Sequence, residues 1–457
     1  MSPTRPHVVV VGGGVAALEA VLALRALAGT RPAITLLAPE EEFSPPAASV
    51  ATPFGFGMPA PLPLEPFAAD HGVELRRGLL GEVDTHARVA VPMGGEPIAY
   101  DHLLIAVGAR RRAAVRGALT FRGPGEVEAV ERLIGDLASG RARRLAIAVP
   151  SSAAWPLPAY ELAIMAAVEL RSRGVKAPDV CVVTPEEHPL EVFGPEAGGA
   201  VATLLAERGI TLHAGCSPTL LRDGELRMRD GRRIAADRVI ALAELVGPYI
   251  PGLPRNSLGF IPTDAHARVT GCEDVYAAGD ATSFPLRQGG LAAQQADAAA
   301  ESIAERMGAI AKAQPFRPVL RGVLLTGGAP LYLRAVVGEG EAPIARRLGT
   351  GPSSAVGRRP LWWPPAKVAG RYLAPLMATA RPAAVTVAPM QDLGMTATAA
   401  DEGDQDALEL ALLLADEDAR FGDYRQALHA LDAARAISGG VLPADYAAKQ
   451  RDWLSRA

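Results

Sequence analysis

The sequence predicts an α/β protein with two doubly wound, Rossmann-like units, the second inserted in the first, and a short helical segment near the C-terminal end. Three observations lead to this prediction. A β-branched run at 7–11 leads through three glycines into a helix-forming run. A second series of strands alternating with helices fills residues 141–245. An apolar strand and a long Ala-rich helix follow at 274–307. Alternation of this kind favours parallel sheets covered by helices.

The first strand and helix carry a G-x-G-x-x-A motif formed by Gly12, Gly14 and Ala17. Glycines at a strand–helix turn let the backbone approach a pyrophosphate, and the free N–H groups and dipole of the helix favour its negative charge. The motif alone is a weak signal, but here the strand before it and the helix after it are both recognisable. The sequence therefore predicts a dinucleotide site at Gly12, Gly13 and Gly14.

A second strand is expected at 34–37, and a dinucleotide fold usually places a ribose-binding acid at its end. Ala38 stands there, and three glutamates follow at 40–42. We take Glu40 as the substitute, while a solvated acidic turn is an equally good interpretation. The Pro-rich stretch 43–61 is expected to be a loop along the cofactor. A strand at 73–77, a hairpin at 82–91 and a buried strand at 100–109 are expected to follow.

In the second unit we expect strands at 144–149, 179–183 and 210–213, with helices at about 124–139, 162–173 and 198–208. The chain then returns to the first unit with a strand at 275–280 that ends in Gly-Asp. Residues 388–403 are polar and typical of a linker, and one helical hairpin of tetratricopeptide type is expected in the tail. The predicted domains are a discontinuous nucleotide-binding unit (5–140 and 246–310), a second unit (141–245), a C-terminal interface region (311–387), the linker and a helical tail (404–457).

Composition excludes several classes of function. The net charge of the 457 residues is −4, with both signs well represented, so no nucleic-acid footprint is evident. None of the three cysteines forms a C-x-x-C pair, which argues against a redox dithiol and against a metal site. The first strand begins at His7, which leaves no room for a secretory signal, and no apolar run reaches the length of roughly 18 residues expected of a membrane span. We therefore expect a cytoplasmic protein.

With these pieces placed, the chain resembles the FAD-dependent pyridine nucleotide–disulfide oxidoreductase superfamily, most of all its sulfide:quinone oxidoreductase and type II NADH dehydrogenase branch. The resemblance rests on the glycine turn, the strand at 100–109 and the strand at 275–280, and it covers about residues 5–380. It implies non-covalent FAD, with the pyrophosphate at the glycine turn. The other implied contacts are the adenine at the Val83 backbone, the flavin nucleotide at Gly108, a ribityl hydroxyl or phosphate at Asp280, and the flavin pyrimidine edge at the helix N-terminus near Gly290 and Leu291.

The second unit departs from both relatives. A type II NADH dehydrogenase would carry G-x-G-x-x-G after the strand at 144–149, but residues 150–161 read PSSAAWPLPAYE. Because proline has no N–H group to offer a phosphate, conventional NAD(P)H binding is not expected. A sulfide:quinone oxidoreductase has a related C-P-x-x-P-Y-E segment, in which Trp155 here replaces the cysteine nucleophile. We take Trp155, Tyr160 and Glu161 as candidate substrate residues; packing at a domain interface is the alternative for the two aromatic residues.

Three functions remain open. The first is an FAD-dependent oxidoreductase that passes a hydride or electrons through the flavin from a small-molecule donor to a small acceptor such as a quinone. The second is a catalytically degenerate flavin-binding module whose helical tail docks a protein partner. The third keeps NADH as donor through a non-standard loop. The cluster of Trp362, Trp363, Lys367 and Arg371 suits a peripheral membrane anchor, or packing onto the flavin unit or a dimer partner.

Overall fold

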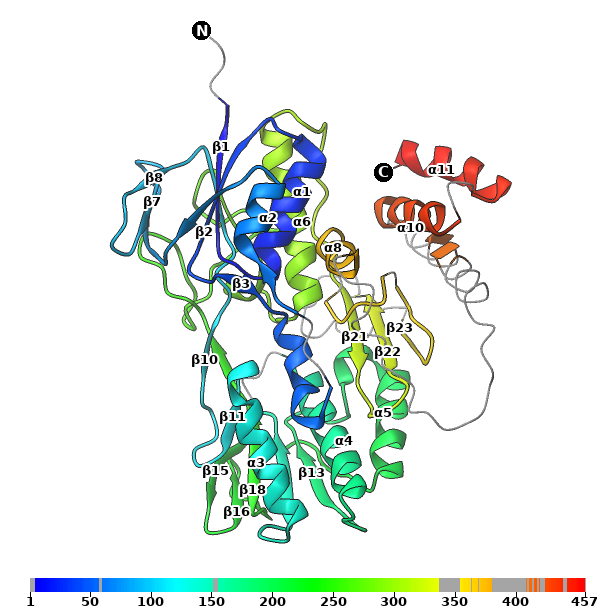
Figure 1. The fold of residues 1–457 in the computed structure, drawn as a ribbon. Helices are drawn as coiled ribbons and strands as arrows, with labels where there is room; N and C mark the ends of the chain where they lie inside the picture. Colours follow the sequence, from blue (N-terminus) through cyan, green and yellow to red (C-terminus); the bar gives the residue numbers. More distant parts are fainter. Residues whose placement is uncertain are drawn as a thin grey trace.

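The computed structural model describes residues 5–56, 60–150, 155–336, 354–362, 364–368 and 370–379, together with parts of 408–456. Figure 1 shows two lobes, each built on a five-stranded parallel sheet. The order of the first sheet is β20-β9-β1-β2-β5, and that of the second is β11-β18-β12-β13-β14. All strands of the second sheet lie between β9 and β20 in the chain, so one unit is inserted in the other. This confirms the predicted α/β class.

Most strands lie where the sequence predicts them. The first sheet contains β1 (His7–Val11), β2 (Ala33–Ala38), β5 (Glu74–Arg77), β9 (His102–Ile105) and β20 (Val275–Ala277). The second sheet contains β11 (Leu119–Phe121), β12 (Arg144–Ala148), β13 (Asp179–Val183), β14 (Thr211–His213) and β18 (Arg238–Leu242).

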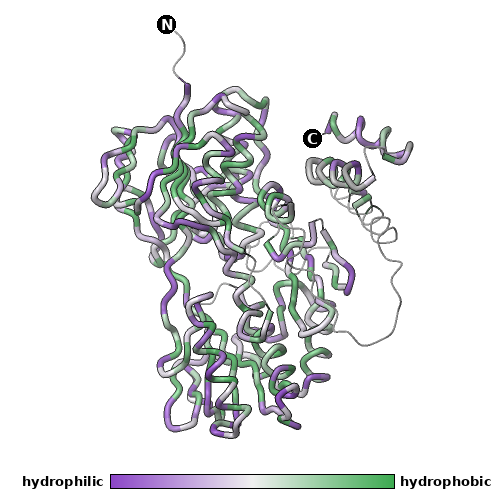
Figure 2. The backbone as a smooth tube through the Cα atoms, viewed as in Figure 1, coloured by the Kyte–Doolittle hydropathy of each residue, from purple (hydrophilic) through white to green (hydrophobic). Residues whose placement is uncertain are grey.

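Strand β1 shows how the first lobe is layered. Val8 and Val10 point to one face, where they join a core with α1 (Val15–Ala28) and α6 (Gly289–Arg306). Val9 and Val11 point to the other face, as the two-residue period of a strand requires. That face is covered by a three-stranded antiparallel sheet of β6 (Leu80–Asp84), β7 (Val89–Pro92) and β8 (Ile98–Ala99). The strands of both parallel sheets therefore form the hydrophobic interior seen in Figure 2.

The second lobe repeats this plan. Ile147 of β12 faces α3 (Val127–Ala138), α4 (Leu157–Ser172) and α5 (Pro195–Glu207). Ala146 and Ala148 face a second antiparallel sheet made of β15 (Pro218–Arg222), β16 (Glu225–Met228) and β17 (Arg233–Ala235). Strand β11 and helix α3 belong to this lobe, although they precede residue 141. The sheet and core of the second unit therefore begin upstream of the boundary that the sequence suggested.

Two further groups of elements complete the body. An antiparallel ribbon of β10 (Arg110–Arg112) and β19 (Glu244–Val246) joins the lobes. A three-stranded sheet of β21 (Val319–Leu324), β22 (Leu331–Val336) and β23 (Ser354–Gly357) packs against the second lobe, and α8 (Leu373–Thr379) follows it. Gly322 of β21 lies so close to Leu157 and Phe193 that a larger residue would displace them. The C-terminal region therefore closes one side of the space between the lobes.

The tail is a separate small unit. Helices α10 (Tyr424–Ile437) and α11 (Ala444–Arg456) pack around Leu431 and Trp453 and stand apart from the lobes in Figure 1. The predicted linker at 388–403 lies outside the described residues. Within the described part of the chain, no helix is both long enough and apolar enough to span a bilayer.

Candidate functional site

A cavity of about 500 Å³ lies where the first sheet, the second lobe and the C-terminal sheet meet. Its wall includes Gly12, Gly13 and Gly14 from the first lobe, Trp155 and Glu161 from the second, and Arg321 and Lys367 from the C-terminal region. Ligands of open α/β sheets bind at the carboxyl ends of the strands, and β1, β9 and β20 all end at this cavity. All three parts of the chain therefore contribute to one site.

The glycine turn is shaped to approach a ligand closely. Gly12 has a φ of +127°, and a Cβ there would collide with the carbonyl of Ala106. Helix α1 begins directly after Gly14 without a side-chain cap, so its first N–H groups are free to meet an anion. A turn without side chains, followed by an uncapped helix N-terminus, fits the pyrophosphate of FAD.

Three other predicted contacts also line the cavity: Glu40, Gly108 and Asp280. The Glu40 carboxylate lies against Gly13, after the end of β2. The Asp280 carboxylate lines the cavity together with Arg111 and Arg287. Burial raises the pKa of Asp280, whereas the positive charges of Arg111 and Arg287 lower it. A carboxylate in the cavity wall at the end of β20 fits a hydroxyl-bearing ligand.

Four predicted contacts do not reach the cavity. Ala17 is fully buried in the core behind the glycine turn. Val83 is also buried; its N–H donates to the Pro251 carbonyl (3.0 Å) and its carbonyl lies against Gly252, so Gly78, Leu79 and Leu80 form that part of the wall instead. Gly290 and Leu291 lie one step inside α6, while Gln288 and Gly289 line the cavity. The expectation for Val83 is corrected because neighbouring backbone occupies its polar groups.

The N-terminus of α6 is held in place by its cap. The Gln288 side chain accepts the N–H of Leu291 (3.0 Å) and donates to the carbonyl of Arg321. This links α6 to β21, and both elements contribute residues to the cavity. The dipole of α6 is therefore directed at the cavity from a fixed position, where it favours negative charge.

Glu161 forms the most unusual interaction in the wall. Helix α4 begins at Leu157, five residues before the expected start, because proline is tolerated in a first helical turn. The Glu161 carboxylate is fully buried and accepts from the Lys367 ammonium at 2.7 and 2.8 Å, and from the Leu325 N–H at 3.0 Å. Burial raises the pKa of Glu161, whereas the Lys367 ammonium lowers it. A buried carboxylate paired with a lysine ammonium therefore borders the cavity.

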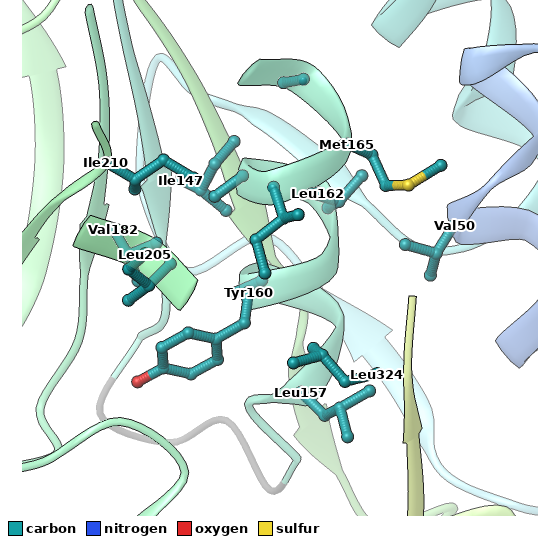
Figure 3. Close-up of a cluster of buried hydrophobic side chains, with 14 of the residues drawn as sticks. Val50, Ile147, Leu157, Tyr160, Leu162, Met165, Val182, Leu205, Ile210 and Leu324 are labelled. Carbon is teal, nitrogen blue, oxygen red and sulfur yellow. The ribbon is translucent and has the colours of Figure 1, made fainter. Parts of the chain in front are cut away.

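Tyr160 is turned away from the cavity. Figure 3 shows its ring on the side of α4 toward Val182 and Leu205, whereas Leu157 lies on the other side. It is fully buried, and its hydroxyl donates to the Glu186 carboxylate (2.7 Å), which also accepts from the Thr184 hydroxyl (2.9 Å). Burial raises the pKa of Glu186 to about 7. The structure therefore removes Tyr160 from the candidate substrate residues.

The indole of Trp155 lines the cavity and meets the ring of Phe193 edge-on at 5.6 Å. Trp362 is buried against Tyr332 and does not reach the surface, and Trp363 lies outside the described residues. The cysteines are free thiols, and none of them lines the cavity. Within the described ranges, no cluster of His, Cys, Asp and Glu could hold a metal ion.

Sequence reasoning missed the pairing of Lys367 with Glu161, because we considered Lys367 only within a cluster that suits a membrane anchor or packing onto the flavin unit or a dimer partner. Lys367 stands 206 residues from Glu161, so no local pattern pairs the two. Arg321 and Gln288 were missed for the same reason. The sequence does carry one usable signal, an acid inside an otherwise apolar helical run, and it applies to both Glu161 and Glu19.

Comparison with known proteins agrees with this geometry. The pyridine nucleotide-disulphide oxidoreductase family matches residues 6–302. The chain is 28% identical over 223 residues to the biphenyl dioxygenase system ferredoxin–NAD(+) reductase component of Paraburkholderia xenovorans (strain LB400), covering 43% of this chain and 47% of that protein. It is 28% identical over 222 residues to the sulfide-quinone reductase of Aquifex aeolicus (strain VF5), covering 45% and 49%. The chain thus matches about half the length of these curated relatives.

Among solved structures, the sulfide:quinone oxidoreductase of Aquifex aeolicus superimposes with a TM-score of 0.69 at 19% identity, over 77% of this chain and 87% of that one. This likeness supports the fold alone. The family match extends over more than half of the chain, and the glycine turn, Asp280 and the α6 N-terminus fit the cofactor. The chain therefore belongs to the pyridine nucleotide-disulphide oxidoreductase family, and its cofactor is FAD.

Proposed function

We propose that this protein reduces a quinone-type acceptor, a small cyclic conjugated dicarbonyl compound, at the end of the cavity formed by Trp155, Glu161 and Lys367. The observation that carries the proposal is the buried Glu161–Lys367 pair. Reduction of a quinone adds two electrons and two protons, and developing charge on its oxygens needs a donor nearby. When bound, FAD supplies the two-electron chemistry.

The side chains have distinct tasks in this proposal. Lys367 donates a hydrogen bond to one carbonyl oxygen of the acceptor and delivers a proton there. Glu161 holds the ammonium in place as its carboxylate partner, and after the transfer Lys367 takes up a new proton from water. The two electrons and the other proton would come from reduced FAD. Trp155, Leu157 and Val323 provide apolar wall for the rings of the acceptor.

Two features of the second lobe favour an electron donor other than NAD(P)H. In a dinucleotide unit, the acid after the second strand binds the ribose. The corresponding acid here is Glu186, which follows β13, is buried and already accepts the Tyr160 hydroxyl. The turn before α4 carries Pro150 and Pro156 in place of a glycine motif. The nucleotide groups of NAD(P)H thus lack both of their usual partners.

The names of two relatives bear on the donor and the acceptor. Sulfide-quinone reductase is the name of one of them, but no cysteine lines this cavity, so a thiol intermediate is not part of our proposal. Another is a component of a ferredoxin system, which makes a protein acceptor the alternative. The Glu161–Lys367 pair favours the small acceptor because it lies in the wall of the cavity.

The test is single-turnover reoxidation. The holoprotein is reduced anaerobically with stoichiometric dithionite and mixed with a water-soluble benzoquinone or naphthoquinone, and the return of oxidised flavin absorbance is followed. We expect saturable reoxidation that slows by about tenfold or more in Lys367→Met, in line with the loss of a general acid. Lys312→Met, at an exposed position outside the cavity, serves as the control. Reoxidation no faster than that of free reduced FAD would refute the proposal.

A further inference from the structure

The helices that follow the central strands β1 and β12 of the two parallel sheets carry a glutamate at the same position. Counting from Val15 and from Leu157, Glu19 and Glu161 are both the fifth residue of their helix. Ala17 and Ala159 are both the third. Each glutamate is fully buried in an otherwise apolar stretch. A buried carboxylate is costly unless it is paired, so each should have a specific partner.

Both partners lie in one short segment, which we call the strap (residues 366–368 and 370–373). Glu161 holds its first part through the Lys367 ammonium. Glu19 holds its last part by accepting the backbone N–H groups of Tyr372 (2.7 Å) and Leu373 (2.8 Å). Burial raises the pKa of Glu19 to about 7, while these backbone hydrogen bonds act against the shift.

The fit at the Glu19 end is tight. A Cβ at Gly370 would collide with the Glu19 carboxylate, so the backbone passes directly over it. At the other end, the Trp362 indole N–H donates to the Ala366 carbonyl (3.2 Å), and Val368 packs on Gly289 at the start of α6. The strap therefore has little freedom to shift along the cavity.

We propose that Glu19 is a positioning residue, which sets the location of the Lys367 ammonium in the cavity by anchoring the strap to the helix that follows the glycine turn. The inference rests on the proposed role of Lys367. Its consequence is that a change in α1, remote from the acceptor, alters proton delivery there. Displacements of this kind reduce rates by between about tenfold and about a hundredfold.

The experiment uses holoprotein with Glu19→Gln and, separately, Gly370→Ala, which disturbs the same contact and leaves both carboxylates intact. Glu301→Gln is the matched control, because Glu301 is a buried glutamate of α6 that also accepts a backbone N–H, from Gln314 outside the strap (2.8 Å). Lys367 is labelled with acetic anhydride and quantified by mass spectrometry against the exposed Lys312. Reoxidation by a quinone is measured in parallel as a limiting rate and a half-saturating concentration.

We expect labelling of Lys367 to rise by about tenfold in both strap variants, and the limiting rate to fall by about tenfold with little change in half-saturation. Unchanged labelling and rate in folded, FAD-loaded Glu19→Gln and Gly370→Ala would overturn the inference, and so would equal effects in Glu301→Gln. If Glu19→Gln fails to fold, Gly370→Ala decides. If the wild-type protein is not reoxidised by quinones, the proposed function fails, while labelling still decides whether Glu19 positions Lys367.

Discussion

The two lobes follow one plan and differ at one turn. Each has a five-stranded parallel sheet with helices on one face and a three-stranded antiparallel sheet on the other. In the first lobe, three glycines join β1 to α1 and open the helix N-terminus to the cavity. In the second, a longer segment with Pro150 and Pro156 joins β12 to α4. The two lobes therefore share a fold but offer different groups to a ligand, because ligand binding depends on the turn between strand and helix and not on the sheet.

The strands β2 and β13, which pair with the central strands β1 and β12, extend the comparison. Glu40 after β2 lines the cavity, whereas Glu186 after β13 is buried beneath Tyr160. A polar group that could have met a ribose is thus satisfied from within the protein. We propose that the second lobe holds Glu161 and Trp155 at the cavity and binds no nucleotide of its own. The following predictions test this contrast.

The largest effect is expected from Gly12→Ala in the first lobe. The φ of +127° is strained by about 1–3 kcal/mol for a residue with a Cβ, and the added methyl group would collide with the Ala106 carbonyl. We expect the purified variant to lose most of its FAD, measured as flavin absorbance per mole of protein. Pro156→Ala, at the corresponding turn of the second lobe, has a φ of −80° that alanine accepts, and should keep its FAD. Equal loss of FAD in both variants would contradict the idea that only the turn of the first lobe binds the cofactor.

The next effect is on the ion pair. Lys367→Met leaves the Glu161 carboxylate buried with only the Leu325 N–H as partner. Removing one member of a buried pair typically costs about 3–5 kcal/mol. We expect a loss of this size in the free energy of unfolding of the holoprotein, measured by chemical denaturation. The double variant Lys367→Met with Glu161→Gln should recover part of it, and a purely additive double variant would show that the two side chains are not coupled.

The sequence was sufficient for the parts of the molecule that depend on local pattern. The runs 7–20 and 275–307 predict strand, turn and helix from their own residues. The FAD end of the cavity could therefore be predicted from Gly12, Gly14 and Asp280. The acceptor end depends on Glu161 meeting Lys367 across 206 positions, and no period or motif encodes such a contact. Val83 shows the same limit, since the Pro251 carbonyl that occupies its N–H comes from a distant loop.

A pH effect is expected from Glu186, the acid of the second lobe. Burial raises its pKa from 4.5 to about 7, so the folded state holds a proton that the unfolded chain releases. The stability that this proton provides is fully present below pH 4.5 and is lost as the pH rises through about 7. The difference corresponds to about 3 kcal/mol at most, since one pKa unit is worth about 1.4 kcal/mol.

The measurement compares wild type with Glu186→Gln, which cannot ionise, by denaturation from pH 4.5 to 8. The free energy of unfolding of the wild type should fall relative to that of the variant as the pH rises from 4.5 to about 7. Above that pH the difference between the two proteins should stay constant. A constant difference would mean that Glu186 is solvated in the folded protein, and the second lobe would then offer an open acid after all.

The smallest effect is expected from Tyr160→Phe. The change removes the donor at 2.7 Å and leaves Glu186 with the Thr184 hydroxyl, a loss of about 1–3 kcal/mol for a buried acceptor. Tyr100→Phe is the matched control, because the buried Tyr100 hydroxyl has no hydrogen-bond partner among the described residues and its removal should be neutral or stabilising. FAD content should not change in either variant.

The same variant tests the proposal that the second lobe binds no nucleotide. Tyr160→Phe frees one face of Glu186, but it leaves the prolines of the turn before α4 in place. We expect NADH at millimolar concentration to leave the flavin of both wild type and variant oxidised, as followed by anaerobic absorbance. Reduction in the variant alone would mean that the Tyr160 hydroxyl is the only barrier, and that the proline turn can still accept a pyrophosphate. The lobes would then differ by one hydrogen bond, and the contrast between their turns would lose its functional meaning.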